Sequence, residues 1–297
     1  MNLLDVTNLC KDFGGLRAVD DVTFHLAEGE ILSIIGPNGA GKTTIFNVMT
    51  GIYPATRGEI RFRDELIVAA SRNRWEHLLR SSMTVLARWV PALPTLLLRS
   101  MGLIPFYRPH EIARRGIART FQTIRLFTHL TALENVMAGQ DHLARSGVAA
   151  TLFRLPTERA EEQHITQRAE HYLQLMGLGQ HRDELARNLA YGDQRRLEIA
   201  RALATEPKLL VLDEPAAGLN EAEALELMAT IRQIRDSGIT ILLIEHDMKV
   251  VMGISDRVVV LDNGRCIATG TPAEIQHNPD VITAYLGEEA VEELLQP

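Results

Sequence analysis

Hydrophobic residues recur along this chain with two different spacings, which predict the segments that form strands and those that form helices. A period of two marks residues 3–9 and 17–26 as strands, with a turn at residues 12–15 between them. Short apolar runs rich in β-branched residues predict buried strands at residues 30–35, 59–62, 209–212 and 240–244. Asn263-Gly264, a dipeptide favoured in two-residue turns, predicts a hairpin of residues 258–262 and 266–269.

A period of three to four residues predicts the helices. The first should begin within residues 41–44 and end before Gly51. The others are expected at residues 111–118, 131–145, 158–176, 193–204, 221–237, 272–277 and 280–286. Because strands alternate with helices over much of the chain, we expect an α/β fold built on a mostly parallel sheet.

The same pattern predicts how the chain is divided. Helical patterns fill most of residues 121–204 and the strand pattern returns only from residue 208, so the stretch 121–204 should form a lobe of its own. It would lie between the two halves of a core lobe, residues 1–120 and 205–286. Residues 1–286 would then form a single domain, followed by an acidic tail at 287–297.

Residues 64 to about 108 differ in composition from the rest of the core lobe. Both tryptophans, Trp75 and Trp89, lie here together with many arginines, three prolines and few acidic residues. We interpret the segment as an insertion. It could contact a membrane partner or lipid headgroups, which arginine and tryptophan favour, or be a solvated helical ornament on the sheet lobe, which we prefer.

Composition and charge narrow the possible classes of function. A net charge of −7 over 297 residues does not favour binding through a broadly basic face, so no nucleic acid partner is expected. The two cysteines lack the spacing of a metal or redox motif and are compatible with a reducing compartment. We expect no signal peptide, and no run reaches the roughly 18 uncharged apolar residues of a membrane span.

A glycine-rich segment between a predicted strand and a predicted helix carries the clearest chemistry. It matches the pattern G-x-x-x-x-G-K-[ST], and we call it the phosphate loop; its residues are Gly36, Pro37, Asn38, Gly39, Ala40, Gly41, Lys42, Thr43 and Thr44. Its backbone N–H groups and the helix N-terminus would surround phosphates. Lys42 should reach the β- and γ-phosphates of a nucleoside triphosphate, Thr43 should bind Mg²⁺, and Thr44 should donate to a phosphate oxygen.

Two adjacent carboxylates follow the apolar run at residues 209–212. Asp213 would stand at the tip of a buried strand, which suits a ligand of Mg²⁺, held through water. Glu214 comes next and points elsewhere, so it could act as the general base on the attacking water. Together with the phosphate loop, this pair predicts hydrolysis of a nucleoside triphosphate.

These motifs, with residues 189–196 between them, resemble those of the ATP-binding-cassette (ABC) ATPases, and the resemblance covers nearly the whole chain. It implies a P-loop NTPase fold, with a RecA-like mostly parallel sheet, an antiparallel β portion and an inserted helical lobe. Residues 189–193 resemble the family signature LSGGQ, and we call them the signature segment. Ala190, Tyr191 and Asp193 depart from it, so the serine hydroxyl contact to ATP is lost while backbone donors remain.

The resemblance also implies roles for residues that the pattern alone would leave unassigned. Ala190 and Gly192 would face ATP bound by the partner of a dimer. Gln122 would join the metal site to the helical lobe, and His246 would contact the γ-phosphate. Phe13 stands where the family stacks an aromatic ring on adenine.

Within this family the chain resembles the ATP-binding subunits of branched-chain amino acid importers, through several short phrases at residues 13–19, 119–122, 188–192, 215–220, 244–248 and 285–287. The resemblance implies ATP and Mg²⁺ as ligands, two transmembrane permease subunits, and a dimer with itself or with a second related ATPase. An extracytoplasmic solute-binding protein would be an indirect partner. The chain would then be a peripheral protein on the cytoplasmic face of the cell membrane.

Other functions stay open at this point. The same group includes urea and amide transporters and resembles a lipopolysaccharide-export ATPase, so the solute is not determined. A non-transport ABC ATPase acting on DNA or the ribosome is less favoured. Such proteins usually carry long coiled coils or two cassettes in one chain, and this acidic chain has neither. The altered signature also leaves room for a catalytically weak subunit, although Lys42, Asp213, Glu214 and His246 argue against it.

Overall fold

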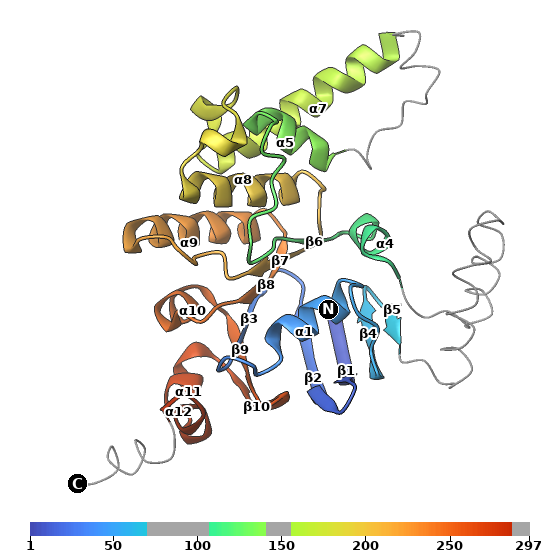
Figure 1. Ribbon diagram of the computed structural model, residues 1–297, viewed down its shortest axis with the longest axis vertical. Coiled ribbons are helices and arrows are strands. Elements are labelled where there is room, and N and C mark those ends of the chain that lie inside the picture. The colour runs from blue at the N-terminus through green and yellow to red at the C-terminus, as the bar shows by residue number, and fades with distance from the viewer. Residues whose placement is uncertain (70–106, 141–155, 287–297) are drawn as a thin grey trace, which may run out of the picture.

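A mostly parallel sheet lies at the centre of the fold (Figure 1). The computed structural model describes residues 1–69, 107–140 and 156–286. Within them six strands pair in the order β10-β9-β3-β8-β7-β6, all parallel except β10, which runs antiparallel to β9. The strands are β3 (Ile31–Ile35), β6 (Ile117–Arg119), β7 (Leu209–Asp213), β8 (Thr240–Ile244), β9 (Arg257–Asp262) and β10 (Arg265–Gly270).

A second, antiparallel sheet lies beside it, with the strand order β2-β1-β4-β5. Its strands are β1 (Asn2–Phe13), β2 (Leu16–Ala27), β4 (Arg57–Phe62) and β5 (Glu65–Ala69). The pattern of the sequence did not predict β5, which falls where we expected the insertion to begin. Arg63 and Asp64 both have positive φ, as a two-residue hairpin turn requires, so β4 turns directly into β5. The rest of the expected insertion, residues 70–106, lies outside the described residues, as does the tail 287–297.

Helices cover both faces of the parallel sheet and form a separate group at one end of the molecule (Figure 1). They are α1 (Lys42–Met49), α4 (Pro109–Arg114), α5 (Ala132–Gly139), α7 (Pro156–Leu175), α8 (Tyr191–Leu203), α9 (Glu221–Asp236), α10 (Met248–Ile254), α11 (Pro272–Gln276) and α12 (Pro279–Leu286). α5, α7 and α8 pack together, and all three fall within residues 121–204, the predicted helical lobe. Within the described ranges, no helix combines the length and apolar character needed to cross a membrane.

The core is built by alternation along buried strands. In β7, Leu209 and Val211 pack with α1 and the antiparallel sheet, whereas Leu210 and Leu212 pack with α8 and α9. All four side chains are fully buried. A parallel strand covered on both faces reads as a continuous apolar run, which is why residues 209–212 could be recognised as a strand.

One helix prediction needs correction, and one helix was not predicted. The helix expected at residues 111–118 is shorter, because Gly116 adopts φ of +97° and ends it. The chain then enters β6, which pairs with β7 through Ile117 and Leu209. A helix not predicted, α10, begins at Met248 and is capped by Asp247, whose carboxylate accepts the Lys249 N–H at 2.8 Å. Of the helix expected at 131–145, the structure shows α5, and residues 141–145 lie outside the described residues.

The parallel strands bring three distant segments to one edge of the sheet. β3, β7 and β8 are neighbours and point in the same direction, so their carboxyl ends meet. Gly36 follows β3, Glu214 follows β7 and Glu245 follows β8. Ligand sites in open α/β sheets form at such edges.

Candidate functional site

The phosphate loop has a backbone that only glycine can adopt at two positions. Gly36 has φ of +150°, and a Cβ atom there would lie 2.1 Å from the Leu261 carbonyl oxygen. Gly41 has φ of +100°, and a Cβ there would lie 2.5 Å from the Ala18 carbonyl oxygen. These close approaches fix the path of the loop between β9 and β2.

The loop ends at the N-terminus of α1. Gly41 is the capping residue, and no side chain caps the helix. The backbone N–H groups of the first helical turn therefore face outward without the usual side-chain acceptor, which suits an anion. Thr43 is exposed and Thr44 half-buried at this end of α1, where a ligand could reach their hydroxyl groups.

Lys42 lies over the loop that it belongs to. Its ammonium group donates to the carbonyl oxygens of Gly36 at 2.6 Å and Pro37 at 3.0 Å. Burial lowers the pKa of Lys42, and the nearby charges of Glu214 and Asp213 oppose that shift. The positive charge is therefore held close to both carboxylates and in position to meet further negative charge.

Asp213 forms a buried ion pair that the sequence did not reveal. Arg119, at the end of β6, donates to its Oδ2 atom at 2.8 Å, and both side chains are almost fully buried. The other end of the Arg119 guanidinium donates to Asn47 at 2.8 Å and Thr50 at 3.0 Å, in and just after α1. Arg119 thus connects the phosphate-loop helix, the Asp213 carboxylate and the segment that leads to Gln122. Burial lowers its pKa, while the bond to Asp213 raises it.

Glu214 lies together with the two residues that the family resemblance selected. The Gln122 side chain donates to its Oε2 atom at 3.0 Å. His246 Nδ1 lies 3.8 Å from the same oxygen, and the His246 side chain is 58% exposed. Glu214 has φ of +50°, which turns its carboxylate away from the direction that Asp213 takes. The structure thus brings Gln122, Glu214 and His246 into one cluster from three separate strand ends.

Glu245 stabilises the backbone on either side of this cluster. Its fully buried carboxylate accepts the N–H of Ala216 at 2.8 Å and that of His246 at 3.2 Å. Burial raises its pKa, and those backbone bonds oppose the shift. The residue joins the loop after Glu214 to the turn that carries His246. A charged residue directly after an apolar strand was the sequence signal for it.

The aromatic residue expected to stack on adenine is one of a pair. Phe13 is 39% exposed and meets Tyr53 edge to face, with ring centroids 5.2 Å apart. The Lys11 ammonium lies 4.7 Å from the Phe13 ring centroid. Tyr53 and Lys11 were not identified from the sequence, because neither belongs to a motif.

The signature segment is placed apart from the phosphate loop of the same chain. Ala190 caps α8 and Gly192 lies in its first turn, beside Leu219 and Glu223. In Figure 1, α8 lies on the far side of the parallel sheet from α1. No hydrogen bond or ion pair among the described residues joins Ala190 or Gly192 to the phosphate loop.

The arrangement fits a nucleotide with its divalent metal ion. Among the described residues, no cluster of three or more His, Cys, Asp or Glu side chains could hold a metal ion. Mg²⁺ bound with a nucleotide needs no such cluster, because one or two carboxylates, waters and the phosphates complete its shell. Asp213 with the Thr43 hydroxyl beside a glycine cradle is a donor set of that kind.

Comparison with known proteins decides the family. A family profile described as ABC transporter matches residues 19–217, and one described as branched-chain amino acid ATP-binding cassette transporter matches residues 265–291. The chain belongs to the ABC transporter family. It is 45% identical, over 96% of its length and 98% of the relative's, to the high-affinity branched-chain amino acid transport ATP-binding protein LivG of Salmonella typhimurium.

A further relative and a solved structure are similar to nearly the whole chain. It is 32% identical to the lipopolysaccharide export system ATP-binding protein LptB of Escherichia coli, covering 97% of the chain and 99% of that protein. The crystal structure of the ADP conformation of MJ1267, an ATP-binding cassette of an ABC transporter, is 30% identical and has a TM-score of 0.74. The alignment covers 97% of this chain and all of MJ1267.

These findings confirm the recognition made from the motifs, the P-loop NTPase fold and the assignment to an ATP-hydrolysing transporter subunit. Nucleotide binding is a property of the family, whereas the role of Mg²⁺ stays a prediction. The lobe boundaries and the roles of single residues also remain predictions, although their positions in the structure are now described.

Proposed function

We propose that this ABC protein is the ATP-hydrolysing subunit of an importer for branched-chain amino acids. The observation that carries the chemistry is the cluster of Gln122, Glu214 and His246 at the strand edge beside the phosphate loop. The solute is supported by 45% identity to LivG and by the match of residues 265–291 to the branched-chain amino acid profile.

The phosphate loop would bind the nucleotide. Its N–H groups and Lys42 would surround the phosphates of ATP, and Phe13 would stack on the adenine. On binding, Lys42 would exchange the carbonyl oxygens of Gly36 and Pro37 for phosphate oxygens. Mg²⁺ would neutralise phosphate charge, and Thr43, Asp213 and Gln122 are the side chains that would hold it.

Glu214 would act as the general base in hydrolysis. Its carboxylate, oriented by the 3.0 Å bond from Gln122, would take a proton from the attacking water. His246, whose side chain is largely exposed, would donate to the γ-phosphate. The bond from Gln122 to Glu214 would keep the base in a fixed position until the nucleotide completes the site.

A dimer would complete each site, because Ala190 and Gly192 lie away from the phosphate loop of their own chain. The exposed start of α8 would offer backbone N–H groups to ATP held by the partner, which is a second copy or a related subunit. ATP binding would then close the dimer, and hydrolysis would open it.

The permease subunits would dock beside the helical lobe. A cavity of about 550 Å³ lies there, lined by residues of α4, β6, α5 and α8. The exposed ring of Phe127 borders it, with the Arg201 guanidinium 5.5 Å from its centroid. Coupling to the permeases would run through residues 122–134, of which Arg125 and Phe127 line this cavity. The chain would thus be a peripheral protein on the cytoplasmic face of the membrane, coupled to an extracytoplasmic solute-binding protein through the permeases.

Two experiments test this function: purification from native membranes and measurement of solute uptake. The expected result is recovery with two permeases, and uptake of leucine, isoleucine or valine that stops when Glu214 is replaced by Gln. Uptake of urea or an amide would overturn the solute while leaving the transport assignment. Recovery with an export complex for lipopolysaccharide would favour a role like that of LptB, to which the identity is 32%.

A further inference from the structure

A fully buried arginine on α8 hydrogen-bonds to the backbone of the segment that carries Gln122. Arg195 has no exposed surface, and its two terminal nitrogens donate to the carbonyl oxygens of Phe121 at 2.7 Å and Gln122 at 2.9 Å. Arg195 lies within residues 189–196, but the sequence assigned it no role. Residues 121–125 are here called the glutamine loop.

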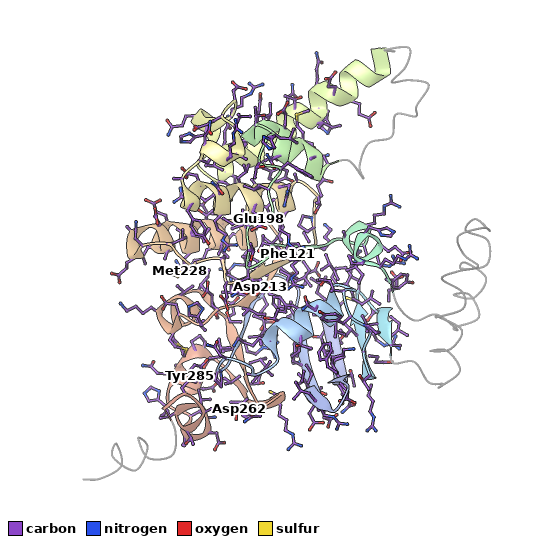
Figure 2. The ribbon with its side chains drawn as sticks, in the orientation of Figure 1. Phe121, Glu198, Asp213, Met228, Asp262 and Tyr285 are labelled. Carbon is purple, nitrogen blue, oxygen red and sulfur yellow. The ribbon has the colours of Figure 1, made fainter. Side chains whose placement is uncertain are left out.

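One turn further along α8, a buried glutamate accepts hydrogen bonds from backbone N–H groups of the same loop. Glu198 Oε1 accepts from Phe121 at 3.4 Å and from Arg125 at 3.2 Å, and its Oε2 accepts from Arg195 at 3.2 Å. Burial raises the pKa of Glu198, while the Arg125 N–H and the Arg195 charge oppose that shift. Figure 2 shows Glu198, Phe121 and Asp213 in that order from α8 toward the sheet.

The two ends of this connection reach different parts of the site. At one end, the Gln122 side chain donates to Glu214 at 3.0 Å. At the other, Arg195 donates to the hydroxyl of Tyr191 in the signature segment at 3.4 Å. The Tyr191 ring in turn lies against Gly218, where a Cβ atom would come within 2.8 Å of it.

We propose that Arg195 and Glu198 are positioning residues that fasten the glutamine loop to the start of α8. Movement of the signature segment is then transmitted to Gln122 and, through Gln122, to the carboxylate of Glu214. This inference rests on the proposed function, in which the signature segment meets the nucleotide of a second chain. It identifies the side chains by which that contact reaches the chain's own general base.

The physical reason is that Arg195 and Glu198 are buried on α8 and find most of their hydrogen-bond partners in the backbone of this loop. Buried carbonyl, N–H and charged groups must keep their hydrogen bonds, since the cost of leaving them unpaired is high. Both acceptors and both donors of the loop bind to side chains one turn apart on a single helix. The loop and the beginning of α8 therefore move together.

Arg195→Met should slow ATP turnover by the purified full-length chain at least about tenfold, as displacement of a catalytic group does. The affinity for a fluorescent ATP analogue should change less than about twofold, because the phosphate loop is untouched. Because Arg195 acts through Gln122, the double variant Arg195→Met/Gln122→Ala should be no slower than the slower single variant.

Arg196→Met is the matched control. Arg196 is the next residue of α8, but it pairs with Glu226 of α9 at 2.6 Å and does not touch the glutamine loop. Its turnover should stay within about twofold of the parent. Glu198→Gln is the second test variant, for use if Arg195→Met does not fold. It keeps the shape of the Glu198 side chain and one acceptor oxygen. It should likewise lower turnover and be non-additive with Gln122→Ala.

Hydrogen exchange gives a readout that needs no ATPase activity. The amides of Phe121 and Arg125 should exchange faster in Arg195→Met and Glu198→Gln than in the parent or in Arg196→Met. Independent, multiplying effects of Arg195→Met and Gln122→Ala, or unchanged exchange at these amides, would overturn the inference. A parent that hydrolyses ATP but imports no branched-chain amino acid would contradict only the proposed function.

Discussion

At the residue scale, two neighbouring acids of one strand end are given different environments. Asp213 continues β7 and meets Arg119 in the interior, whereas Glu214 adopts φ of +50° and meets Gln122 near the surface. A non-glycine residue at positive φ is held there by its surroundings and is common at functional sites. The backbone, more than the side chains, therefore separates the predicted metal ligand from the predicted base.

Replacement of Glu214 by Gln should retain ATP and slow its hydrolysis by about 10²- to 10⁴-fold, the usual contribution of a general base. The amide keeps the shape of the carboxylate and one acceptor for Gln122. Turnover and retained nucleotide are measured on the same preparation. Glu221→Gln, at an exposed glutamate on α9, is the control, and comparable rates in both variants would remove Glu214 from this role.

Replacement of Arg119 by Met should destabilise the chain by about 3–5 kcal/mol, because it leaves the buried Asp213 carboxylate without its partner. Urea unfolding followed by circular dichroism measures this loss. Adding Asp213→Asn should restore part of it, since the uncompensated charge is then gone. Arg61→Met breaks an exposed pair with Glu59 and should cost less than about 1 kcal/mol. Additive losses at Arg119 and Asp213 would show that the pair is not coupled.

At the scale of elements, local pattern identified most strands and helices but not their ends. The helix expected at 111–118 ended early because Gly116 takes a positive φ and the next residues pair with β7. That pairing joins residues more than ninety positions apart, so no window of the sequence could contain it. α10 was missed although Asp247 is a good capping residue, because its apolar stripe is only two turns long.

Within the phosphate loop, Gly36 and Gly39 should differ sharply in their tolerance of a side chain. Gly36→Ala places a Cβ 2.1 Å from a backbone oxygen of Leu261, so we expect a more than tenfold loss of ATP affinity, about 1.4 kcal/mol. At Gly39 a Cβ would meet nothing within 4 Å, and only its φ of +85° costs about 1–2 kcal/mol of stability. Titration with labelled ATP compares the two. Equal losses would mean that backbone strain, and not the contact with β9, controls the loop.

At the scale of the whole molecule, the proposed nucleotide site draws its residues from both sheets and from the segment next to the helical lobe. Phe13 comes from the antiparallel sheet, the phosphate loop from β3 and α1, and Gln122 from the segment held by α8. A ligand that touches all three should stabilise them together, because it binds only when they are in place.

MgATP should therefore raise the thermal unfolding midpoint of the full-length chain. At about one hundred times its Kd, a ligand stabilises the folded state by about 2.7 kcal/mol, which corresponds to a shift of about 4 °C for a chain of this length. Differential scanning fluorimetry measures the shift. Lys42→Ala should abolish it, whereas Lys249→Ala, at an exposed lysine on α10, should not. A full shift in Lys42→Ala would contradict the phosphate-loop assignment.

The sequence by itself determined the strands with buried runs, the glycine-rich loop, the carboxylate pair and the family, because each depends on residues close together in the chain. Only the tertiary structure decided which partner each buried charge meets. The partners Arg119 and Asp213 are separated by 94 positions, and Arg195 and Phe121 by 74. Neither buried pairing has a local signal, since a buried charge is compensated by whatever group the packing of distant elements brings against it.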